Sequence, residues 1–117
     1  MALDPNTAEF VDQSEAYITT MGADFTTYAY LLGGSQHIGI HIEWDAAVTG
    51  VMYLEYSGDF TLNTTSWVAF NAINVDSSMR DLMFLDANLA IARFRVKWQR
   101  LTGTANVLGH IIRQKGY

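Results

Sequence analysis

The 117-residue chain is predicted to be all-β, an antiparallel β-sandwich or jelly roll of about eight strands. Apolar and polar residues alternate with a period of two at residues 36–44, 48–56 and 92–99, which is the pattern of strands with one buried face. Clusters of Gly, Asn, Ser and Asp separate the patterned segments, as turns do. No window of eleven or more residues shows a helical repeat.

Each alternating segment assigns its apolar residues to one face, which we expect to be the core. These residues are Ile38, Ile40, Ile42 and Trp44, then Val48, Met52, Leu54 and Tyr56, and finally Phe94, Val96 and Trp98. Shorter strands are expected at residues 15–21, 26–32, 66–70 and 81–86, with a longer loop at 71–80. The chain is expected to form one domain, residues 1–117, whose first 14 residues form a loose arm.

The basic stretch at residues 93–116 is expected to be the final β-hairpin. A two-residue turn at Thr102-Gly103 would place Trp98 opposite Val107, Val96 opposite Gly109 and Phe94 opposite Ile111. This register keeps the apolar residues on one side and the charged residues on the other.

Composition bounds the class of function. Only 16% of the residues are charged and the net charge is −5, which opposes general affinity for nucleic acid. There is no cysteine, so disulfides and thiolate ligands are excluded. No secretory signal pattern and no apolar run of about 18 residues are found. We therefore expect a protein that is made in a cytoplasm, is not secreted and does not enter a membrane.

Charge is divided unevenly along the chain. Residues 1–79 contain ten Asp and Glu and no Lys or Arg, whereas residues 80–117 contain seven Lys and Arg against two Asp. The two parts are expected to attract each other, on neighbouring strands or between subunits.

Arg93, Arg95 and Lys97 form the basic face of their strand, and two interpretations remain open. In the first, they pair with Glu43 or Glu55 on an adjoining strand. In the second, they contact an acidic surface of another protein, which includes another copy of the chain. Nucleic acid is the least favoured partner, because no aromatic residue lies among these basic residues on their face of the strand.

No motif for catalysis or cofactor binding is present. His37 and His41 would lie about 13 Å apart on a strand that rises about 3.3 Å per residue, too far to share a metal ion, and a site at His41 and Glu43 would need ligands from other strands. There is no G-x-S-x-G elbow and no phosphate-binding loop. We expect no enzyme, no metal and no cofactor. Trp67, beside the loop "TLNTTS", is a candidate platform for sugar stacking.

One set of residues forms a recognisable pattern over roughly half the chain: Trp44-Asp45-Ala46, Gly50, Leu54-Glu55, Ser57-Gly58-Asp59, Trp67, the strand 93–100, Thr102-Gly103-Thr104 and Lys115-Gly116. In this pattern the chain resembles small structural proteins of tailed bacteriophages. The stretch between Asp59 and Trp67 is longer here than in that pattern, and the first forty residues show no resemblance.

The resemblance implies a jelly-roll-like sandwich located in a virion, where it decorates and stabilises a capsid by binding the major capsid protein or another virion protein. Such proteins commonly form symmetric homo-oligomers, often trimers, in which many weak contacts add up. The alternative function is a carbohydrate-binding module for host attachment, with Trp67 as its platform.

Overall fold

The computed structural model describes residues 7–31, 35–57, 67–86 and 93–116. The regular elements in these residues are all strands, and every pair of them is antiparallel. They are β1 (Thr7–Ala8), β2 (Phe25–Thr26), β3 (Tyr30–Leu31), β4 (Ser35–Trp44), β5 (Val48–Ser57), β6 (Val68–Val75), β7 (Asp81–Asp86), β8 (Arg93–Gly103) and β9 (Val107–Gly116). The prediction of an all-β, antiparallel protein is confirmed.

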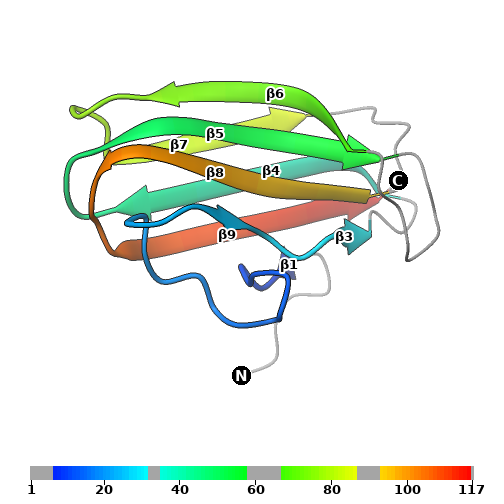
Figure 1. Ribbon diagram of the computed structural model, residues 1–117. Coiled ribbons are helices and arrows are strands. Elements are labelled where there is room, and N and C mark those ends of the chain that lie inside the picture. The colour runs from blue at the N-terminus through cyan, green and yellow to red at the C-terminus, as the bar shows by residue number, and fades with distance from the viewer. Residues whose placement is uncertain (1–6, 32–34, 58–66, 87–92, 117) are drawn as a thin grey trace.

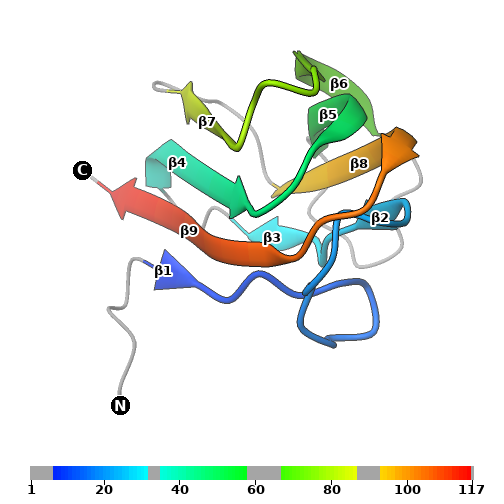
Figure 2. The same cartoon turned by 90° about the vertical axis from the view of Figure 1, so that its left-hand side faces the viewer.

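The strands form two sheets that pack face to face. The first has the order β1-β9-β4-β7, and the second has the order β2-β8-β5-β6, with β3 also paired to β8. Figure 1 shows the long strands running along the molecule, and the view in Figure 2 separates the two layers. Successive strands such as β4 and β5 lie in different sheets, so the chain crosses repeatedly between the layers.

The core lies between the sheets and contains most of the apolar residues that alternation predicts. Tyr56 is the exception, because it is only half-buried, and the side chain of Ile38 lies outside the described ones. Ile40, Ile42 and Trp44 of β4, Val48, Met52 and Leu54 of β5, and Phe94, Val96 and Trp98 of β8 are all at most 1% exposed. Both buried indoles have a hydrogen-bond acceptor, because the Nε1–H groups of Trp44 and Trp98 donate to the carbonyls of Met79 and Met21 at 3.1 and 3.0 Å. Burying one large apolar side chain contributes about 1.5–3 kcal/mol.

The predicted hairpin at residues 93–116 is wrong. β8 pairs with β5, whereas β9 pairs with β4, so the two strands lie in opposite sheets. Val107 is opposite Trp44 instead of Trp98, and Gly109 is opposite Glu43. Strands in opposite layers turn their apolar faces toward each other across the core, so the alternation that predicts a hairpin fits this arrangement equally well.

The chain leaves its sheet at Gly103, which has a φ of 92°. A Cβ at this position would lie 2.3 Å from the carbonyl oxygen of Ala47, so only glycine fits. The Thr102-Gly103 turn signal in the sequence is therefore real, but it marks a crossing between sheets.

Several weaker strand predictions also need correction. Residues 15–21 form no strand and are tied by single bridges, Val11 to Tyr17 and Thr20 to Asn106. The strand predicted at 26–32 is broken into β2 and β3. The loop predicted at 71–80 is half strand, because β6 continues to Val75, which is buried.

The described part of the N-terminal segment is not a loose arm. β1 pairs with β9, and Phe10 is fully buried in the core, with its ring 5.7 Å from that of Phe25. Burial of one phenyl ring holds this irregular segment against the sheets. Residues 1–6 of the predicted arm lie outside the described residues.

Candidate functional site

The three basic residues of the predicted contact face lie on the outer side of β8 with very different exposure. Arg93 is 5% exposed and lies opposite Ser57, which is also buried. Arg95 and Lys97 are partly exposed. A partner protein can therefore reach Arg95 and Lys97 more readily than Arg93.

Arg95 is held between an acid and an aromatic ring. Its Nε donates to Oε1 of Glu55 on β5 at 2.8 Å, and its guanidinium carbon lies 4.2 Å from the centroid of the Trp67 ring. Glu55 is one of the two acids predicted to pair with the basic face, and this prediction is confirmed for Arg95. The prediction that Glu43 pairs with the basic face is wrong, because Glu43 lies on β4 in the other sheet.

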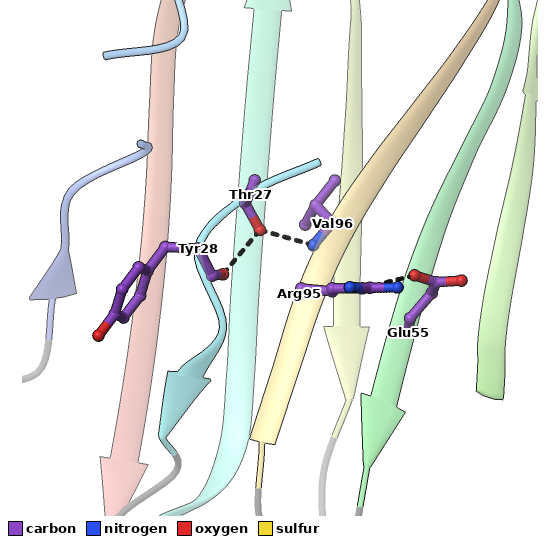
Figure 3. Close-up of polar contacts among 5 residues, drawn as sticks. All are labelled: Thr27, Tyr28, Glu55, Arg95 and Val96. Carbon is purple, nitrogen blue, oxygen red and sulfur yellow. Dashed lines mark hydrogen bonds and ion pairs between the residues drawn. The ribbon is translucent and has the colours of Figure 1, made fainter. Parts of the chain in front are cut away.

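The contact between Arg95 and Glu55 is a cross-strand pair with most of its area covered, since the two side chains are 19% and 12% exposed. Because little water reaches the pair, the attraction between the charges of Arg95 and Glu55 is screened less than on an open surface. The cation–π contact between Arg95 and Trp67 adds a second attraction. The side chain of Arg95 is thus fixed in one orientation. Figure 3 shows it reaching across from β8 toward Glu55.

Thr27 shapes the other wall of the site where the strand breaks between β2 and β3. Its hydroxyl accepts a hydrogen bond from the Val96 N–H at 2.8 Å and donates one to the Tyr28 carbonyl at 3.0 Å (Figure 3). The side chain thereby replaces a backbone acceptor that an unbroken strand would supply to β8. The Tyr28 N–H is released to bond the Val11 carbonyl at 2.9 Å.

These groups line a cleft of about 290 Å³ over the outer face of β8. Its lining consists of Gln13, Thr27, Tyr28, Ala29, Trp67, Arg93 and Arg95. The sequence identified both arginines and Trp67 as candidates for different functions, and the fold brings them together. Gln13 and Tyr28 were not predicted as lining residues. Gln13 lies outside every predicted strand, and the strand predicted at 26–32 is broken at Tyr28, so its pattern does not show which side chain faces β8.

A second cleft of about 420 Å³ shares Gln13 with the first and contains Lys97. Asp12, Ser14 and Asp24 also line it. The Ser14 hydroxyl and the backbone N–H of Ala16 donate to the Asp12 carboxylate and hold its pKa below the ordinary value of 3.8. The first cleft, which is lined by two arginines, therefore adjoins a second cleft that is lined by both acidic and basic residues.

The chemistry of the two clefts suits binding. The described lining of neither cleft includes a histidine, and that of the first includes no carboxylate. The clefts offer three cations, aromatic rings and the amide of Gln13, which are usual anchors of protein and ligand recognition.

The edge strand β6 begins directly after Trp67 and extends this surface. β6 ends its sheet among the described strands and carries no charged residue. Its Val68 and Phe70 side chains are 53% and 41% exposed. The other described sheet edges are protected: β7 begins and ends with Asp81 and Asp86, and β1, β2 and β3 have two residues each. Edges that lack such protection pair readily with another chain.

A scan against protein-family models finds no match, and a search of curated proteins finds none either. The part of the chain that the structure describes contains no helix long and apolar enough to cross a bilayer.

Proposed function

We propose that the chain is a non-enzymatic structural protein of a bacteriophage virion, a jelly-roll-like subunit that decorates and stabilises the capsid. The strand order supports the jelly roll. If β2 and β3 count as one strand interrupted at residues 27–29, eight strands lie in two four-stranded sheets that the chain crosses repeatedly. Eight-stranded double sheets of this kind occur in viral capsid proteins and in lectins.

The observation that carries the proposal is the uncharged, exposed edge of β6. A chain that stays monomeric risks aggregation through such an edge, and natural proteins normally add charge or proline there. An uncharged edge does not lead to aggregation where another copy in the oligomer covers it. We therefore assign β6 to a contact between copies in a homo-oligomer.

The symmetry of the oligomer depends on which surface of the neighbouring copy pairs with β6. Antiparallel pairing of β6 with its own copy gives a two-fold dimer, whereas pairing with a different surface of the next copy closes a ring such as the trimer that the resemblance implies. The capsid contact is assigned to the adjacent outer face with Arg95 and Lys97, opposite an acidic surface of the major capsid protein. Several such contacts per oligomer add up to firm attachment.

Sedimentation velocity of the purified chain tests the role of β6. We expect a discrete oligomer that the Val68→Lys substitution dissociates, because a lysine on the edge must be desolvated for the strands to pair. Leu108→Lys is the matched control, since Leu108 is 64% exposed on β9 and should not affect the oligomer. A monomer at high concentration, or equal dissociation by both substitutions, contradicts the proposal.

The second candidate is a carbohydrate-binding module, which the two aromatic residues Trp67 and Tyr28 in one cleft favour. Arg95 covers one face of the Trp67 ring, so a sugar could stack only on the other face. A glycan array distinguishes the two functions. Binding that is lost with Trp67→Ala but kept with Tyr17→Ala, an exposed aromatic outside the cleft, would favour the module.

A further inference from the structure

Three potential metal ligands meet on the outer face of the sheet β1-β9-β4-β7. His41 and Glu43 point to the same side of β4, and Glu43 lies directly opposite Asp81 on β7. The Nε2 atom of His41 is 3.1 Å from Oδ2 of Asp81 and 3.5 Å from Oε1 of Glu43. The sequence pairs His41 with Glu43 but supplies no third ligand, and the pairing of β4 with β7 provides it.

The spacing of these atoms suits a four-coordinate ion. Bonds of about 2.0–2.2 Å to nitrogen and oxygen at tetrahedral angles place neighbouring ligand atoms about 3.3 Å apart. The two separations from His41 lie on either side of that value. All three ligand atoms lie within 4.8 Å of one another, so a small change of side-chain torsion completes the set.

Among the residues whose side chains the structure describes, no Lys or Arg pairs with these two acids. Glu43 and Asp81 have His41 as their ionic partner. The neighbouring Arg80 turns its guanidinium to the carbonyls of Ser77 and Met79, each at 2.8 Å. Two carboxylates beside one imidazole thus form a compact acidic site on backbone that two strands hold in register.

The third strand leaves room beside the site. Gly109 on β9 lies opposite Glu43, and a Cβ there would already be 3.7 Å from Oε2 of Glu43. Any longer side chain would extend over the carboxylate. The absence of one keeps the approach open for an ion and for the water that would complete its coordination.

We propose that His41, Glu43 and Asp81 bind a divalent transition-metal ion, with Zn²⁺ as the expected type. An imidazole nitrogen with two carboxylate oxygens suits such ions, whereas Ca²⁺ needs six to eight oxygen ligands and Mg²⁺ keeps most of its water. The bound ion cross-links β7, the edge strand, to β4. The fourth position is open to water or to a side chain of a partner. This site is independent of the proposed capsid function.

Isothermal titration of the full chain with ZnCl₂, and the visible absorption spectrum with Co²⁺, test the site. We expect saturable one-to-one binding and the intense Co²⁺ bands of a four-coordinate ion. His41→Gln and Asp81→Asn should weaken binding on the order of tenfold or more. Glu15→Gln, which removes one exposed acid elsewhere, and His37→Gln, which removes another histidine, should leave it unchanged.

Thermal melts without metal verify that each variant is folded. In the wild type, Zn²⁺ should raise the melting temperature, because an ion that binds only the folded state stabilises it. His41→Gln should melt at the same temperature with and without Zn²⁺. Absence of one-to-one binding, or binding that the His37→Gln substitution abolishes and His41→Gln does not, overturns the proposal.

Discussion

Replacing Thr27 by valine tests whether the Thr27 hydroxyl substitutes for the backbone acceptor that is lost at the break between β2 and β3. Valine has nearly the shape of threonine, so the fully buried position remains filled while the hydroxyl is lost. The substitution removes the acceptor of the Val96 N–H and the donor to the Tyr28 carbonyl. The hydrogen bond of the Val96 N–H is buried, whereas the one to the Tyr28 carbonyl is only partly buried, so the loss of the first should dominate.

Leaving one buried N–H without a partner costs about 1–3 kcal/mol. With a urea slope of about 1–3 kcal/mol/M, the unfolding midpoint of Thr27→Val should fall by about 1 M. Amide exchange at Val96 should also accelerate, because its hydrogen bond has been removed. Both quantities are measured on the same protein, by tryptophan fluorescence and by NMR.

Thr102→Val is the matched control for this substitution. The Thr102 hydroxyl bonds that of Thr49 at 2.6 Å on the exposed surface, where water can replace the lost partner. We expect a change within about 0.5 kcal/mol. Equal stability of Thr27→Val and wild type, or equal losses in the two variants, would refute the view that the Thr27 hydroxyl acts as a substitute backbone acceptor.

Two further predictions concern the core and acid stability. Trp98→Ala should lower the free energy of unfolding by about 3–5 kcal/mol, measured in urea, because the ring is fully buried; a near-neutral result would contradict its place in the core. Hydrogen bonds from the Ser78 side chain and backbone hold the pKa of Asp76 below its ordinary value of 3.8. Its contribution to stability is therefore present above that value and lost as the pH falls through the lower folded-state pKa. The melting temperature of Asp76→Asn should fall less steeply than that of wild type in this acid range, and parallel curves would contradict the assignment.

Alternation in the sequence predicts which side of a strand is buried but not which strand lies beside it. It therefore places Trp44 and Trp98 correctly in the core. The same pattern cannot distinguish a hairpin at residues 93–116 from two strands in opposite sheets, because both arrangements point Val96 inward. Sequence neighbours pair in a sheet about two-thirds of the time, and this pair is an exception.

The N-terminal segment shows a second limit. Phe10 and Met21 are fully buried, yet both lie in irregular segments. Phe10 precedes every predicted strand, and Met21 ends the strand wrongly predicted at 15–21, so alternation does not indicate the burial of either residue. The same limit explains why Gln13 and Tyr28 were missed as lining residues.

The candidate site was predictable where it depends on strand faces. Arg95 and Lys97 are on the outer side of β8 as expected, and the pairing of Arg95 with Glu55 follows from the attraction between the acidic and basic parts of the chain. The cluster of His41, Glu43 and Asp81 depends on the register between β4 and β7, which residues 40 positions apart in the sequence do not reveal.

The proposed capsid function is tested most directly by co-sedimentation of the purified chain with capsids of a bacteriophage whose genome encodes the chain. The wild-type chain should bind capsids saturably at a fixed ratio to the capsid protein. Lys97→Glu, which reverses a charge on the assigned contact face, should weaken this binding without dissociating the oligomer. A wild-type chain that stays in the supernatant with capsids at every concentration would contradict the proposed function.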